Sequence, residues 1–169
     1  MDCHKIYEIA LNIKEKYGTA DPYDLCECMG VHVRYADIGS LKGMYKYIKK
    51  NYFILINSSL DSNMRRMICC HELCHHILHR DIARNTTVWD SMLYDMSAGT
   101  EQEANLLCAE FLIEDEYMRP EDITDKTPDM IGAELGVDKN LVMLKAMSMK
   151  NRGYDMRCDF CVASDYLGR

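Results

Sequence analysis

The apolar residues in the first third of the chain recur at helical spacing and then at strand spacing. Gly18 ends the first helical pattern, and a second, shorter pattern begins at Pro22 and ends at Gly30. Alternating apolar residues then predict three strands, with Lys49-Lys50-Asn51 suited to the turn of a hairpin. The predicted strands are residues 31–35, 44–48 and 52–57. This part of the chain is therefore expected to form two helices and a small antiparallel sheet.

Helical patterns dominate the rest of the chain. A long apolar run predicts a helix over residues 63–80, with Asp61 or Ser62 as its cap. After it come a polar irregular segment at 81–99, a helix at 100–115, a helical pair at 128–150 and a tail at 151–169. The expected fold class is α+β, a mostly helical domain whose three-stranded antiparallel sheet packs on the 63–80 helix. Residues 1–127 are expected to form its core, with residues 128–169 packed on the same domain.

Composition narrows the class of protein. The chain has 169 residues, of which 48% are hydrophobic and 28% charged, as expected for one globular domain. A net charge of −7 argues against direct binding of nucleic acid, which normally uses a basic patch. No apolar run is long enough to span a bilayer, and the first residues lack the layout of a signal peptide. Nine scattered cysteines then favour a reduced, cytoplasmic protein over a disulfide framework.

The predicted 63–80 helix carries a pattern with metal-binding chemistry. His71-Glu72-Leu73-Cys74-His75 reads H-E-x-x-H, and four of the six histidines fall between positions 71 and 79. Residues four apart project from the same side of a helix, so His71 and His75 can bind one metal ion. Glu72 then lies beside the metal and can act on a water molecule.

A catalytic zinc needs a third protein ligand, and two candidates compete for that role. His79 lies about 12 Å along a straight helix from His71, too far to share one ion, so it is interpreted with His76 as a packing or helix-end residue. Glu101 is the better candidate, since helical phase places it on the apolar side of the 100–115 helix.

The same helical phase assigns roles to the other polar residues of this helix. It places Glu103 and Glu110 on the solvent side, and Thr100-x-x-Glu103 reads as a capping box. Asn105, four residues after Glu101, shares the inward side. It could accept the second ring N–H of a liganding histidine or bond to the backbone.

Together these residues resemble the ImmA/IrrE family of gluzincin-type metallopeptidases. The family pattern H-E-L-G-H-x-x-L-H is matched at six positions, with Cys74 in place of the glycine. The matching residues are His71, Glu72, Leu73, His75, Leu78 and His79. The downstream motif is matched at Glu101, Glu103, Ala104 and Asn105, but its usual trailing proline is absent.

The resemblance covers about residues 5–150 and implies a minimal zincin-like fold. It implies that His71, His75 and Glu101 bind Zn²⁺ and that Glu72 is the catalytic acid/base. Many members of the family are encoded on phages or integrative elements and cleave a helix-turn-helix repressor. The implied function is therefore a zinc-dependent endopeptidase with one protein partner. Such enzymes often use a Tyr or His as oxyanion donor, and Tyr94 is a candidate.

Three other interpretations remain open. Residues 131–147 have the spacing of a helix-turn-helix, although the charges of residues 128–150 balance to zero, so these helices could instead cover the core or bind a protein. A non-proteolytic zinc regulator acting through these helices is the alternative function. The thiols of Cys69, Cys70 and Cys74 could take part in metal or redox chemistry, or simply pack the helix. Cys158-x-x-Cys161 has metal-knuckle spacing, but free thiols suit a lone pair better.

Overall fold

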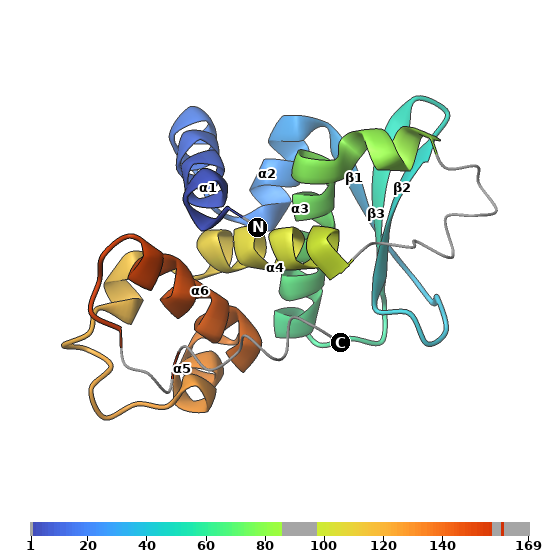
Figure 1. Ribbon diagram of the computed structural model, residues 1–169. Coiled ribbons are helices and arrows are strands. Elements are labelled where there is room, and N and C mark those ends of the chain that lie inside the picture. Colours follow the sequence, from blue (N-terminus) through green and yellow to red (C-terminus); the bar gives the residue numbers. More distant parts are fainter. Residues whose placement is uncertain (1, 86–97, 157–159, 161–169) are drawn as a thin grey trace.

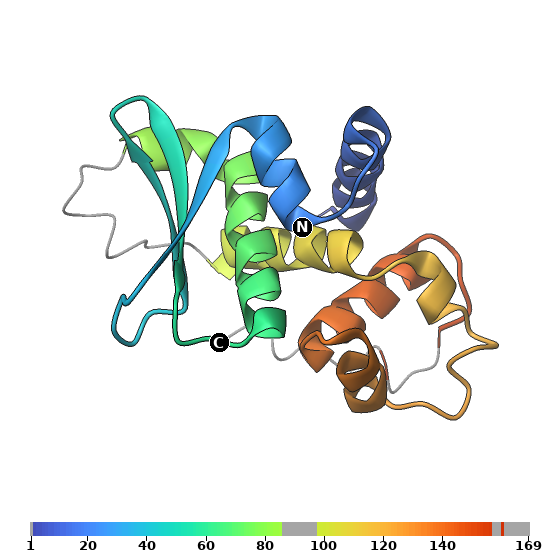
Figure 2. The same cartoon turned by 180° about the vertical axis from the view of Figure 1, so that it is seen from behind.

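The computed structural model describes residues 2–85, 98–156 and 160. Helix α3 (Ser62–Asn85) lies at the centre, with the sheet on one side and the first two helices on the other (Figures 1 and 2). Helix α4 (Ala98–Leu112) crosses α3, and the two helices are in extensive contact. The α+β class is therefore confirmed. Among the described residues, no helix combines the length and the apolar character that crossing a bilayer requires.

Capping residues set the limits of the first two helices. Helix α1 spans Cys3–Tyr17 and helix α2 spans Pro22–Met29. The carboxylates of Asp2 and Asp21 accept hydrogen bonds from the first free backbone N–H groups of each helix. Gly18 and Gly30 end them with φ of 70° and 69°, a conformation that costs glycine little. Both predicted stops are confirmed.

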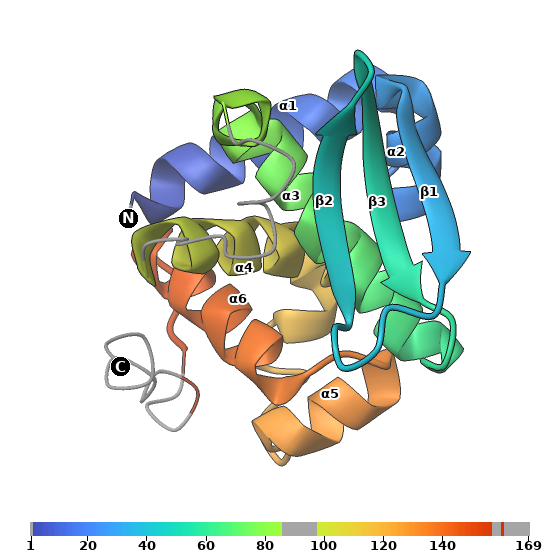
Figure 3. The same ribbon diagram turned by 90° about the vertical axis from the view of Figure 1, so that its right-hand side faces the viewer.

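The sheet differs from the expected one in its strand order. Strands β1 (Val31–Ala36), β2 (Gly43–Ile48) and β3 (Asn51–Asn57) are arranged β1-β3-β2, with β3 between the other two (Figure 3). Strand β3 pairs antiparallel with β2 but parallel with β1. The predicted antiparallel sheet is wrong in this respect: the sheet is mixed.

The apolar character of β3 fits its place at the centre of the sheet. Residues 37–42 connect β1 to β2, which lies at the opposite edge. The chain then turns back, and β3 occupies the position between the two edge strands. Ile54 and Ile56 are completely buried, as expected for the central strand. Lys49 and Lys50 form the hairpin turn with positive φ, as a two-residue primed turn requires.

Helix α3 is longer than predicted, and it is not straight. It continues to Asn85, and His79 interrupts it with φ of −129° and ψ of 25°. The prediction of a continuous helix ending at Arg80 was therefore wrong. His76 packs as expected: its Nδ1 is 2.7 Å from the Tyr45 hydroxyl, and its ring meets Tyr52 edge-on.

The C-terminal helices pack against the same core. Helix α5 spans Pro128–Leu135 and helix α6 spans Lys139–Asn151, while a short 3₁₀ helix, η2, spans Asp115–Met118. Helix α6 contacts both α4 and α1. The division of the chain at residue 127 stays a prediction.

Helix α6 covers a face of α4 that the sequence pattern assigned to solvent. Glu110 was expected on the solvent side, but it is 1% exposed. Its Oε2 lies 2.6 Å from Nζ of Lys145, itself completely buried on α6. The prediction was wrong because the pattern of one helix marks a charged residue as exposed. Here α6 covers Glu110 and supplies Lys145 as its ion-pair partner. Helix α4 also begins at Ala98, so Thr100 lies inside the first turn and not at the predicted cap.

Gly43 allows β2 to lie directly on α3. A Cβ atom at this position would be 2.2 Å from Cγ2 of Ile68 and 3.5 Å from Cγ of Glu72. We expect Gly43→Ala to destabilise the fold by about 1–3 kcal/mol, the usual cost of overpacking. Urea denaturation measures this. Ile68→Ala removes the clashing methyl, so the double variant should lose less stability than the sum of the two single changes. Additive losses would contradict the close approach.

Candidate metal centre

His71 and His75 face the same point from one side of α3. Their Nε2 atoms are 3.0 Å apart, and their rings are nearly perpendicular, with centroids 4.6 Å apart. This is the arrangement expected of residues one helical turn apart. His75 is buried and His71 is partly exposed, so the point that they face lies at the edge of the core.

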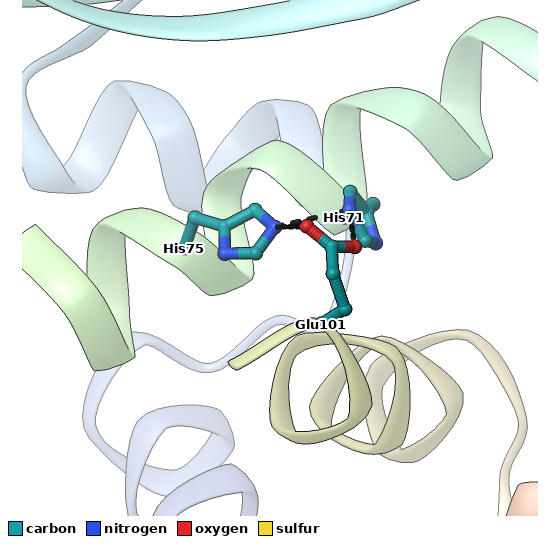
Figure 4. A group of neighbouring side chains, drawn as sticks. All are labelled: His71, His75 and Glu101. Atoms are coloured by element: carbon teal, nitrogen blue, oxygen red, sulfur yellow. Dashed lines mark hydrogen bonds and ion pairs between the residues drawn. The ribbon is translucent and has the colours of Figure 1, made fainter. Parts of the chain in front are cut away.

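Glu101 reaches the same point from α4. Its Oε2 lies 3.3 Å from Nε2 of His71, and its Oε1 lies 3.5 Å from Nε2 of His75 (Figure 4). Glu103 points elsewhere, with Oε2 3.8 Å from Nε2 of His79. The crossing of α3 and α4 thus brings Glu101, and not Glu103, to the two imidazoles.

The three side chains form a group that could bind a metal ion. Their ligand atoms lie within 4.8 Å of one another, and no other such group occurs in the part of the chain that the structure describes. Two neutral imidazoles and one carboxylate are a ligand set that zinc accepts. The two Nε2 atoms need a proton or a cation between them, because facing lone pairs repel each other. The residues present therefore fit a zinc ion.

Charge at this point favours the ionised carboxylate. Hydrogen bonds with His71 and His75 hold the pKa of Glu101 well below its usual range. Burial lowers the pKa of His71, but the neighbouring Glu101 and Glu72 outweigh it and the net shift is upward. Burial lowers the pKa of His75. This downward shift in pKa favours the neutral form of the His75 ring, which is the form that can coordinate a metal ion.

Asn105 determines which nitrogen of His71 faces the centre. Its Oδ1 is 2.8 Å from Nδ1 of His71, and an amide oxygen can only accept a hydrogen bond. Nδ1 therefore donates this hydrogen bond. In the protonated ring Nε2 also donates, to Glu101, and in the neutral ring Nε2 keeps the lone pair that can bind a metal ion. Of the two roles open for Asn105, the structure shows the contact with the ring.

Glu72 lies next to this group under strand β2. Burial raises the pKa of its carboxyl to about 7, although His71 acts in the opposite direction. The backbone of Tyr45 on β2 forms a hydrogen bond with the carboxylate. A carboxyl group with a pKa near neutrality can take up and release a proton at physiological pH.

The structure also addresses the remaining candidates from the sequence. Cys69, Cys70 and Cys74 are completely buried in the core, as packing residues would be. Tyr94, Cys158 and Cys161 lie outside the described residues. The contributions of Gly43 and of the Tyr45 backbone were missed, and only the glycine at the start of the hairpin could have indicated the close approach of β2.

Comparisons with known proteins agree with this geometry. The sequence profile of the IrrE N-terminal-like domain matches residues 26–146. The chain is 34% identical to "Uncharacterized immunity region protein 2" of Bacillus phage phi105 over 139 residues, which are 81% of the chain and 87% of that protein. It is 24% identical to "Metallopeptidase ImmA" of Bacillus subtilis (strain 168) over 117 residues, 68% of the chain and 64% of that protein. With most of its length matched and His71, His75 and Glu101 gathered at one point, the chain belongs to the ImmA/IrrE family of metallopeptidases.

Proposed function

We propose that this protein is a zinc-dependent endopeptidase that cleaves one specific protein partner, a helix-turn-helix repressor of a phage or mobile element. The observation that carries the proposal is the convergence of two imidazoles and one carboxylate beside the half-buried Glu72. The named relatives support the biological setting, since one belongs to a phage immunity region and another is a metallopeptidase.

The proposed roles follow from the positions of the side chains. His71, His75 and Glu101 would hold the zinc ion, which when bound lowers the pKa of water and polarises a peptide carbonyl. Asn105 keeps His71 in the coordinating tautomer.

Proton transfer falls to Glu72. With a pKa of about 7, its carboxylate can take the proton of an attacking water molecule and return it to the leaving amine. The hydrogen bond with the Tyr45 backbone orients this carboxylate while it changes its charge.

The proposal is tested with the purified protein and a candidate repressor, a small helix-turn-helix protein sought among the products of the neighbouring genes. We expect one zinc ion per chain by elemental mass spectrometry and cleavage of the repressor, both lost in His75→Ala. His4→Ala is the matched control, because His4 is exposed on α1 and far from the ligands in sequence. Full zinc occupancy in His75→Ala would remove that residue from the ligand set. A zinc-loaded protein that leaves the repressor intact would contradict the substrate.

Asn105 offers a separate prediction. We expect Asn105→Ala to lower zinc affinity about 10- to 100-fold, the usual effect of losing the partner of a liganding histidine. A competition titration with a zinc-binding dye measures the change. Asn105→Asp keeps an acceptor at the same place and should retain most of the affinity. Equal affinity in Asn105→Ala would show that the contact with His71 does not support the metal.

The rival function through DNA binding finds little support in α6. Seven of its thirteen residues are buried against the core, so little of its surface remains for a DNA groove. This burial is typical of a helix that covers a core, and we prefer that role for the α5–α6 pair.

A further inference from the structure

A second cluster of charged side chains lies away from the metal centre. It lines an open cavity of about 480 Å³ between α1, the end of α4, η2 and α6, whose arrangement can be followed in Figure 1. Glu110 is nine residues from Glu101, or about 13 Å along α4. The proposed peptidase chemistry uses none of these residues.

The floor of the cavity is a buried network of ion pairs. Nζ of Lys145 lies 2.6 Å from Oε2 of Glu110 and 2.6 Å from Oδ1 of Asp115. Arg152 binds Asp115 through two nitrogens, at 2.6 and 2.9 Å, and lies 3.9 Å above the ring of Tyr7. Glu110 and Lys145 are almost completely buried, whereas Asp115 is partly exposed, and the cost of burying charged groups is only partly offset by the ion pairs.

One acceptor in this network has no donor. Glu110 lines the cavity and is 1% exposed. Its Oε1 is buried and forms no hydrogen bond within the described part of the chain. A buried carboxylate oxygen without a donor is unfavourable, because it has lost its hydrogen bonds with water and gained none in return. The protein thus retains an unused acceptor next to an open space.

The charge around the cavity indicates what would use this acceptor. Its four carboxylates face three cations, counting Arg152, and the described structure shows no ion pair for Glu114 or Glu116. Burial lowers the pKa of Lys14 at the rim and Lys145 adds to that shift, while Glu110, Glu114 and Asp115 act in the opposite direction. Because the carboxylates outnumber the cations by one, a ligand of this cavity should be positively charged and should donate a hydrogen bond to Oε1 of Glu110.

We propose that this cavity binds a primary ammonium group, which donates to Oε1 of Glu110 and is attracted by Glu114. The group could belong to a small free amine or to a lysine side chain of a protein partner. Binding there would contact the same helix that supplies Glu101, at its opposite end. The proposal stands independently of peptidase activity.

The test is calorimetric titration of the full-length, zinc-loaded protein at pH 7 with n-butylammonium, and with n-butanol as the neutral control. We expect saturable binding of the ammonium only, and its dependence on Glu110, which lies about 13 Å along α4 from Glu101, excludes coordination of the amine to the metal. Glu110→Gln should weaken binding about tenfold or more, the size of a lost hydrogen bond to a charged group. Equal binding of n-butanol, or no saturable binding of either compound, would overturn the proposal.

Two further variants keep the test decisive if Glu110→Gln does not fold. Glu114→Gln changes an exposed carboxylate at the cavity and should weaken binding at least twofold, while Glu121→Gln changes an exposed carboxylate outside it and should not. If both variants weakened binding equally, the ammonium would be attracted only by the net charge of the chain, which would contradict a site in this cavity. Acetyl-lysine-amide, with its free side-chain amine, then separates the sources: binding indicates a lysine of a partner, and exclusion indicates a free amine.

Discussion

Glu72→Gln is expected to retain the zinc ion and to lower kcat/KM for repressor cleavage by about 10³-fold. The amide keeps the shape of the side chain but cannot accept a proton, and general acid–base catalysis contributes about 10²- to 10⁴-fold. The metal ligands His71, His75 and Glu101 are untouched, so elemental analysis should still find one zinc per chain. A discontinuous cleavage assay with the purified repressor measures the loss.

Glu103→Gln is the matched control for this experiment. Glu103 lies two residues from a proposed ligand but points to His79 and not to the centre, so its change should leave cleavage near normal. Normal cleavage by Glu72→Gln would refute the acid/base assignment. Loss of zinc from that variant would show instead that Glu72 supports the metal.

Lys145→Ala is expected to destabilise the fold by about 3–5 kcal/mol, because it leaves the carboxylate of Glu110 buried without its cation. This is a large part of the 5–15 kcal/mol typical of a whole domain. Urea denaturation followed by circular dichroism measures the change in the free energy of unfolding.

An exposed lysine on the same helix provides the control for Lys145. Lys150→Ala should change stability by less than about 0.5 kcal/mol, since surface substitutions usually do. The double variant Lys145→Met/Glu110→Gln removes both charges and should recover part of the loss. A Lys145→Ala variant as stable as the wild type would show that Glu110 tolerates burial without its partner.

The sequence was sufficient for features that depend on local spacing. The four-residue interval brings His71 and His75 together, and the helical phase of α4 distinguishes Glu101 from Glu103. The first inference depends only on the geometry of one helix, whereas the second also depends on how α4 crosses α3, and the same helical phase placed Glu110 wrongly. The family resemblance, confirmed by the profile match, rests on the same residues.

Features that depend on contacts between distant segments could not be predicted in this way. The parallel pairing of β1 with β3 depends on where a loop carries the chain, and the burial of Glu110 depends on α6, some thirty-five residues later. Helix α3 is interrupted at His79 although it contains no proline or glycine, the residues that usually indicate a break in a helix. Each of these features is decided by tertiary packing, which the pattern of residues within one segment does not contain.

Because the three proposed ligands come from two crossing helices, a zinc ion bound by them would also hold α4 against α3. An ion that binds only the folded chain stabilises it by RT ln(1 + [Zn]/Kd), about 2.7 kcal/mol at a hundredfold excess over Kd. Chelation would therefore loosen the attachment of α4 to α3 as well as remove activity. If zinc binds as proposed, the melting temperature of this protein would rise with the concentration of free zinc, and the chain would be more open to proteolysis in a cell short of zinc.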